Sequence, residues 1–301
     1  MSLDIFGFRA LWSPFFLILL LVILASYFLV TTKYRTHFQQ SEALTRKQWI
    51  SFASAILLLY VVKGSPIDLL GHIMFYVHMI QMAILYLVIP ILFIYGIPPW
   101  VWRSILTRPI IKPLFDFFTK PLIALILFNG VFSFYHVPNI FDIVKTDMWL
   151  HAVYTSILFL LAICMWWPLV NELEEYETLN GLKKVGYIFA DGILLTPACA
   201  LIIFADTPMY STFSDPNAWA SALELCVPST TLASLNLSGP EMFNSMSLLE
   251  DQQTGGVLMK VIQEVVYGLI LAQVFFSWFK KEQTIDELPT SQTSFQPEPT
   301  K

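Results

Sequence analysis

Seven long apolar stretches divide this 301-residue sequence, and each is bounded by charged residues, proline or glycine. A helix needs about 20 mostly apolar residues to cross the hydrocarbon core of a bilayer. The second and fourth stretches are shorter than this, so we expect them to extend over residues 45–63 and 120–138. The pattern predicts an all-α, polytopic membrane protein, a bundle of seven transmembrane helices over Leu11–Val30, Trp49–Val62, Ile73–Tyr95, Leu122–Tyr135, Trp149–Val170, Gly186–Ala205 and Val257–Phe279.

The composition supports a bilayer as the solvent of this chain. Only 13% of the residues are charged and 56% are hydrophobic, whereas an average soluble domain carries roughly 25% charge. Asp4 precedes the first apolar stretch, which is longer than the core of a signal peptide, so we interpret that stretch as a retained span. The net charge of -5 and the lack of a dense basic patch argue against a nucleic-acid partner. We expect a multi-pass protein of the cell membrane.

The distribution of basic residues predicts the orientation of the bundle. Thirteen of the 17 Lys and Arg residues fall in segments 32–48, 96–120 and 171–185 or in the C-terminal tail. Cytoplasmic loops carry the excess of Lys and Arg in membrane proteins. We therefore predict that the N-terminus is outside and the C-terminus inside, and that the outer side has only Arg9, Lys63, Lys145 and Lys260.

This topology defines two regions. Residues 1–280 form a seven-helix membrane domain with an extracytoplasmic loop at 206–256. Residues 281–301 are rich in Ser, Thr, Gln, Pro and Glu, a composition typical of a disordered tail, here cytoplasmic.

Four of the five histidines fall at the predicted outer ends of spans. His72 and His78 lie at the start of the third span, His136 closes the fourth, and His151 opens the fifth. Ionisable groups within spans are costly and usually face a bundle interior, so they are functional candidates. The topology thus predicts a cluster of imidazoles at one depth.

Methionines accompany these histidines. Met74 and Met82 are each one helical turn from His78. Imidazole and thioether together suit copper, particularly Cu(I). Cys199 and Cys226 could add a thiolate, although we favour a purely structural role for both. The predicted metal ligands are His72, His78, His136, His151, Met74 and Met82.

Acidic and amide residues lie near the same outer ends. Two interpretations are open: they orient the imidazoles from a second layer, or they cap helix ends. Lys260 and Glu264 have the spacing of a local ion pair, whereas Asp191 is isolated in the inner half of the sixth span. The candidates for orienting the histidines are Gln81, Asp206, Asp251 and Gln252.

Common catalytic motifs are absent from the sequence. It contains no H-E-x-x-H, no G-x-S-x-G and no Walker A motif. We therefore expect that the protein is not an enzyme.

Several motifs together resemble the CtaG family, the assembly factors of caa3-type cytochrome c oxidase in Gram-positive bacteria. The resemblance covers nearly all of the chain from the third span onward. It rests on His78-Met79-Ile80-Gln81-Met82, Tyr135-His136-Val137-Pro138 with Asp142, His151 ahead of Trp166-Trp167-Pro168, Asp206-Thr207-Pro208-Met209-Tyr210, and Asp251-Gln252-Gln253-Thr254-Gly255-Gly256.

The resemblance implies a seven-span protein that is needed for active oxidase and delivers copper to the Cu(B) centre. We expect oxidase subunit I or its assembly intermediate as the partner, and the further candidates are a copper donor on the outer side and a second copy of the chain. This sequence has Met82 where many relatives have a second His, and Tyr154-Thr155 where they have Glu-His. The positions that the resemblance to the CtaG family implies to be functional are His78, Gln81, His136, His151 and Asp251.

Three other functions fit part of the pattern. Two histidines at one depth on different helices would also suit haem. A transporter would need polar residues on the inner side, yet the inner halves of the third and fifth spans are almost wholly apolar. A metal-free scaffold for oxidase assembly is the third alternative.

Overall fold

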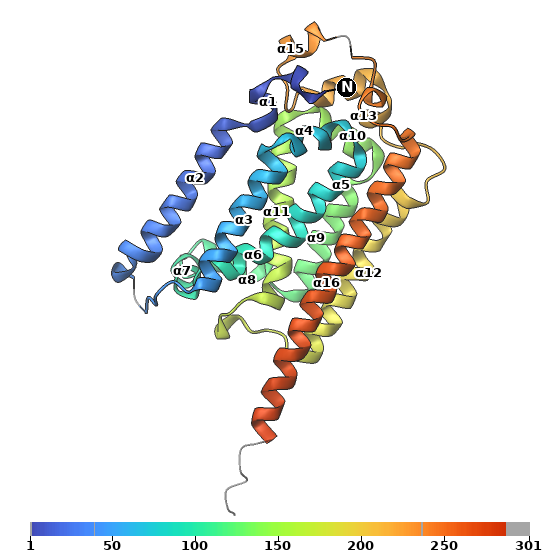
Figure 1. Cartoon of the computed structure of the whole chain (residues 1–301). Coiled ribbons are helices and arrows are strands. Elements are labelled where there is room, and N and C mark those ends of the chain that lie inside the picture. Colours follow the sequence, from blue (N-terminus) through green and yellow to red (C-terminus); the bar gives the residue numbers. More distant parts are fainter. Residues whose placement is uncertain (1, 39, 236, 287–301) are drawn as a thin grey trace, which may run out of the picture.

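A computed structural model describes residues 2–38, 40–235 and 237–286, with side chains described up to residue 280. The described part is 81% helical and contains no strand. Figure 1 shows the helices as one bundle, with small helices at both ends. The all-α prediction is confirmed.

Five helical segments are long and apolar enough to cross a membrane. The first, Phe8–Lys33, contains α1 (Phe8–Trp12) and α2 (Pro14–Phe28). The second, Phe75–Gly96, contains α5 (Phe75–Ala83) and α6 (Ile89–Gly96). The others are α11 (Met148–Val170), α12 (Gly181–Ile203) and α16 (Leu248–Asp286).

Two further spans are bent pairs of helices. The angle is 48° between α3 (Arg46–Gly64) and α4 (Pro66–Ile73), and 79° between α8 (Ile111–Phe118) and α9 (Pro121–Tyr135). A proline at the first position of α4 and of α9 explains both breaks, since proline starts a helix easily but cannot continue one. Counting each pair once gives the seven predicted spans.

Short helices connect the spans. One end of the bundle, which we call the loop end, carries α10 (Pro138–Thr146), α13 (Ser211–Ser214), α14 (Pro216–Leu223) and α15 (Ser229–Ser234). The opposite end carries α7 (Pro99–Leu106) and α8. The N-terminus lies at the loop end and α16 leaves the bundle at the opposite end, as an odd number of spans requires (Figure 1).

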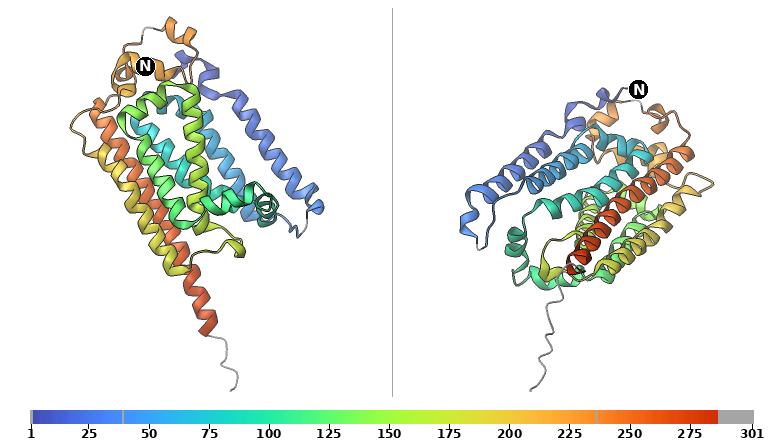
Figure 2. Two further views of the ribbon diagram at one scale, coloured as in Figure 1. Left: turned by 180° about the vertical axis from the view of Figure 1, so that it is seen from behind. Right: turned by 60° about the horizontal axis from the view of Figure 1, so that its bottom comes forward.

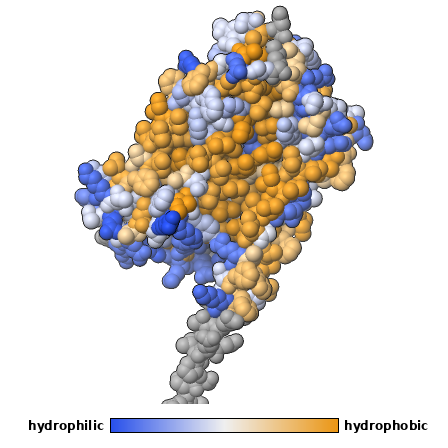
Figure 3. All heavy atoms as spheres, viewed as in Figure 1, coloured by the Kyte–Doolittle hydropathy of each residue, from blue (hydrophilic) through white to orange (hydrophobic). Residues whose placement is uncertain are grey.

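The span formed by α5 and α6 is the centre of the bundle. Its most apolar window is 72% buried, whereas that of Phe8–Lys33 is only 11% buried. Figure 2 shows α2 at the edge and α12 and α16 side by side on the other flank. The broad apolar surface in Figure 3 covers the middle of the bundle, as expected for a surface that faces lipid.

Two predicted boundaries were wrong at the loop end. The third span begins at Phe75, because the backbone of Met74 is extended (φ −124°, ψ 131°). His72 therefore belongs to α4, and Met74 is not on the helical face of His78. The predicted loop 206–256 is also too long, since α16 begins at Leu248. Ser247 and Glu250 form a reciprocal cap there, with hydrogen bonds of 2.9 and 3.3 Å.

The predicted tail falls mostly outside the described residues. The backbone of α16 continues as a helix to Asp286, into the segment expected to be disordered. Residues 287–301 lie outside the described part of the chain.

Candidate functional site

A cavity of about 540 Å³ lies near the loop end between α3, α4, α5 and α11. Apolar residues form most of its wall, including Phe16 on α2 and Leu160 on α11. Six of the lining residues carry a side-chain nitrogen or sulfur atom: Lys63, His72, His78, Gln81, Met82 and His151.

Helix ends bring the three histidines of the cavity together. His72 is in the last turn of α4 and His78 in the first turns of α5. His151 is in the first turn of α11, whose start is fixed by Asp147, which accepts a 2.8 Å hydrogen bond from the Leu150 amide. The ring centroids of His72 and His151 are 5.8 Å apart. The structure thus places three of the four predicted histidines around one cavity.

Each of these three imidazoles has a buried ring nitrogen that lacks a partner among the described residues. These atoms are Nδ1 of His72, Nε2 of His78 and Nδ1 of His151. A buried polar atom without a hydrogen bond costs about 1–3 kcal/mol. Three such atoms make these histidines candidates for metal binding, whereas the ligand atoms that lie within 4.8 Å of one another among the described residues belong to Asp68, His72 and Cys226.

His136 lies outside this cavity, in an aromatic cluster. It is fully buried, and its Nδ1 donates a 2.8 Å hydrogen bond to the carbonyl of Phe132. Tyr135 bridges the two regions, since its ring centroid is 5.1 Å from His136 and 6.0 Å from His78. The Nε2 of His136 has no partner among the described residues. Of the four imidazoles predicted to form a single cluster, three thus line the cavity, and that of His136 lies behind the ring of Tyr135.

Met74 and Met82 also differ in their surroundings. Met82 lines the cavity. Met74 packs in a separate apolar cluster with Phe6, Leu69 and Trp219, under the 204–247 loop. The break before α5 turns Met74 away from the face that carries His78, so we interpret it as a packing residue.

The predicted orienting residues contact backbone rather than imidazoles. Asp251 accepts hydrogen bonds from the amides of Phe75 and Tyr76, at 2.9 and 3.0 Å, and thereby caps α5. Gln252 accepts a 2.7 Å hydrogen bond from the Met209 amide. Asp206 is exposed. Helix capping, one of the two interpretations of these residues, describes the contacts of Asp251.

Gln81 does line the cavity, but its side chain holds α3 and α4 together. Its Nε2 donates to the carbonyl of Val62 and, at 3.2 Å, to Oδ1 of Asp68. The side-chain amide lies directly over Gly71, where any Cβ would collide with it. Gln81 therefore orients a carboxylate of the site instead of an imidazole.

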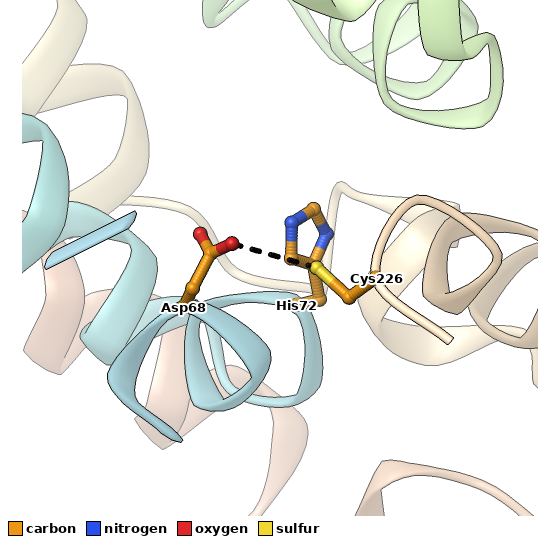
Figure 4. A group of neighbouring side chains, drawn as sticks. All are labelled: Asp68, His72 and Cys226. Atoms are coloured by element: carbon orange, nitrogen blue, oxygen red, sulfur yellow. Dashed lines mark hydrogen bonds between the residues drawn. The ribbon is translucent and has the colours of Figure 1, made fainter. Parts of the chain in front are cut away.

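A second group of metal-binding side chains adjoins the cavity. One ligand atom from each of Asp68, His72 and Cys226 lies within 4.8 Å of the other two. In Figure 4, Asp68 and His72 project from α4 toward Cys226 on the segment that follows α14. Asp68 and His72 are four residues apart, a spacing that could have identified the pair. Cys226 joins them only through the packing of the loop.

Charges in this group are paired or suppressed. Lys63 forms a 2.6 Å ion pair with Oδ1 of Asp68. The Cys226 thiol donates to Oδ2 of Asp68 at 3.6 Å. Burial, together with the nearby carboxylate, raises the pKa of the Cys226 thiol well above its ordinary value, so the thiol is protonated at neutral pH.

The residues singled out in the two last spans lie away from the cavity. Asp191 is buried and accepts hydrogen bonds from Asn129 and Tyr267, both at 2.5 Å. Lys260 and Glu264 form the predicted ion pair at 2.9 Å. Asp191 is therefore a structural contact between α9, α12 and α16.

The comparison with known families decides the identity of this architecture. The chain matches the cytochrome c oxidase caa3 assembly factor family (Caa3_CtaG) over residues 8–281. It belongs to the Caa3_CtaG family. No curated protein and no solved structure was found to match it. The match to Caa3_CtaG covers all seven spans and every residue that lines the cavity.

Proposed function

We propose that this Caa3_CtaG protein binds copper in the histidine-lined cavity and delivers it to the Cu(B) centre of a caa3-type cytochrome c oxidase. Copper is the cargo of the protein in this proposal. The observation that carries it is that His72, His78 and His151 line one cavity and that each has a buried and unpartnered ring nitrogen.

The chemistry of the cavity favours copper over harder cations. Imidazole and thioether are suitable ligands for Cu(I), whereas Mg²⁺ and Ca²⁺ prefer oxygen. Met82 supplies the thioether beside the three imidazoles. The wall of the cavity is mostly apolar, and an apolar shell around a metal site limits the access of solvent to the ion.

The position of the cavity suits a membrane-embedded acceptor. Its histidines lie one to a few turns inside the loop end of the spans. The wall includes Leu160, whose side chain is 61% exposed on the lipid-facing surface of α11. Cu(B) lies within the membrane part of an oxidase subunit, so a donor at similar depth can pass the ion sideways by ligand exchange.

The proposal implies two kinds of partner protein, a copper acceptor and a copper donor. The acceptor is oxidase subunit I or its assembly intermediate, in the same cell membrane. An upstream copper donor would approach from the loop end, where the ligands lie closest to the surface. A metal-free scaffold would need the same acceptor but no copper donor.

Metal analysis of detergent-purified protein tests the proposal. After anaerobic reconstitution with Cu(I), wild-type protein is expected to retain stoichiometric copper, and His72→Ala/His78→Ala/His151→Ala is expected to lose it. His37→Ala is the matched control, because His37 is exposed at the opposite end of the bundle. Oxidase activity in cells that carry the triple variant should fall, and that of the control should not.

Two results would overturn the proposal. Copper-free wild-type protein that still supports oxidase assembly would indicate a scaffold. A Soret band in the optical spectrum of the purified protein would indicate a haem protein instead.

A further inference from the structure

The Asp68–His72–Cys226 group lies where the 204–247 loop packs on α4, and His72 of this group also lines the cavity. Asp68 and His72 are on α4, and Cys226 reaches them from the loop (Figure 4). His72 is 4% exposed, and its Nδ1 has no partner among the described residues. A thiol, an imidazole and a carboxylate therefore converge beside a cavity that already contains further imidazoles.

We propose that Cys226 and His72 form a loading site, where Cu(I) is captured at the loop end before it enters the cavity. The inference rests on the proposed function, because it takes copper as the cargo. It adds a second ligand set, in which a thiolate binds the ion first. Thiolate is the side chain that most strongly favours Cu(I).

Apolar packing fixes the position of Cys226 relative to α4. Trp219, Leu223 and Val227 are almost completely buried and pack against Leu69 and other apolar residues of α4 and α5. The Cys226 amide also donates a 3.0 Å hydrogen bond to the carbonyl of Leu223. The thiol is thus held by a folded segment of the loop.

Asp68 is oriented so that one oxygen faces the thiol. Its Oδ1 accepts hydrogen bonds from Lys63, at 2.6 Å, and from Gln81, at 3.2 Å. Its Oδ2 is left to the Cys226 thiol. Asp68 is therefore a positioning residue that accepts the thiol proton when the ion binds.

The binding step balances without a change of oxidation state. The S–H bond of Cys226 breaks and an S–Cu(I) bond forms. The proton moves to Oδ2 of Asp68 and then to solvent, so each bound ion releases one proton. No electron is transferred, and no oxidant or reductant is needed.

His72 links the loading site to the cavity. It belongs to the Asp68–His72–Cys226 group and also lines the cavity, 5.8 Å from His151 between ring centroids. An ion held by Cys226 and His72 can therefore exchange the thiolate for His151 while His72 stays bound. Ligand exchange of this kind keeps the ion out of water throughout.

The test uses full-length protein in detergent and a Cu(I)–glutathione complex as the copper source. Wild-type protein is expected to show a transient Cu(I)–thiolate charge-transfer absorption, with proton release, before copper settles in the cavity. Cys226→Ser should lose this absorption and load copper more slowly, yet reach the same final copper content. Cys164→Ser is the matched control, because Cys164 lies on α11 and is not part of the group.

A second measurement tests the loading site without depending on correct folding of Cys226→Ser. With Cys164 and Cys199 replaced by Ser, Cu(I) should slow the alkylation of Cys226 by N-ethylmaleimide. His72→Ala should remove that protection, and Asp68→Asn should reduce proton transfer and slow loading.

The outcomes separate this inference from the proposed function. Equal loading rates and equal absorption in wild-type and Cys226→Ser protein would overturn the loading site and leave the cavity proposal standing. Protection of Cys226 by Zn(II) but not by Cu(I) would also overturn it. If wild-type protein binds no copper at all, both proposals fail.

Discussion

At the scale of single residues, the least expected feature is a completely buried lysine. The side chain of Lys145 on α10 is 0% exposed. Its Nζ donates a 2.9 Å hydrogen bond to the carbonyl of Gly71 and lies 4.0 Å from the centre of the Phe213 ring. Lys145 therefore connects α10 to the end of α4, directly next to His72.

Burial makes the protonation of Lys145 a determinant of stability. The pKa of Lys145 lies well below its usual value of 10.5 because burial disfavours the ammonium form. The unfolded chain then binds more protons than the folded one below pH 10.5, so the free energy of unfolding rises with pH. We expect thermal unfolding temperatures of wild-type protein to rise between about pH 7 and pH 10 relative to those of Lys145→Met. Parallel pH profiles of the two proteins would contradict this prediction.

At the scale of helices, the contact between α16 and α5 positions the cavity. Asp251 on α16 caps the first amides of α5. One turn further along α16, Gly255 allows the two helices to approach closely. A Cβ at Gly255 would lie 2.8 Å from a ring carbon of Phe75 and 3.1 Å from the Cα of Tyr76. Since part of this contact is backbone, α5 cannot move aside without shifting His78.

Substitution at Gly255 tests this contact. Gly255→Ala is expected to lower the free energy of unfolding by about 1–3 kcal/mol, because overpacking must displace α16 from α5. Gly268→Ala on the same helix is the matched control, since no atom lies within 4 Å of a Cβ there. Thermal unfolding in detergent measures both. Equal stability of the two variants would show that the helices separate at little cost.

At the scale of the whole molecule, the candidate metal-binding side chains are concentrated at one end of the bundle. His72, His78, His136 and His151 lie at the loop end, together with the buried Lys145 and with Cys226. Arg103 and Lys112 are at the opposite end, where they pair with Glu175 and Asp116. A wide apolar surface separates the two ends (Figure 3). Which of the two ends faces the cytoplasm stays a prediction from the distribution of Lys and Arg.

Chemical labelling tests the orientation. In a cysteine-free background, Ser221→Cys on α14 should react with a membrane-impermeant maleimide in intact cells. Ala43→Cys, between the first two spans, should react only after the membrane is opened. Both residues are exposed in the structure, so access to solvent is matched. The reverse pattern would place the loop end inside and would contradict delivery of copper from the outer side.

The class of fold follows from the sequence alone. Apolar length decides where a chain crosses a bilayer, because every backbone polar group there must bond within its own helix. The seven spans, the Lys260–Glu264 pair and the grouping of His72, His78 and His151 near one depth all followed from local spacing. So did the family, through motifs whose order along the chain is specific.

The contacts between distant side chains, in contrast, depend on tertiary packing. The break at Met74 turned Met74 into the apolar cluster under the loop and placed His72 on α4. The bend after Gly64 brought Asp68 to Lys63 and Gln81, and the packing of the loop brought Cys226 to Asp68. Such contacts join residues up to 158 positions apart. They depend on how helices pack against each other, which periodicity within one segment does not encode.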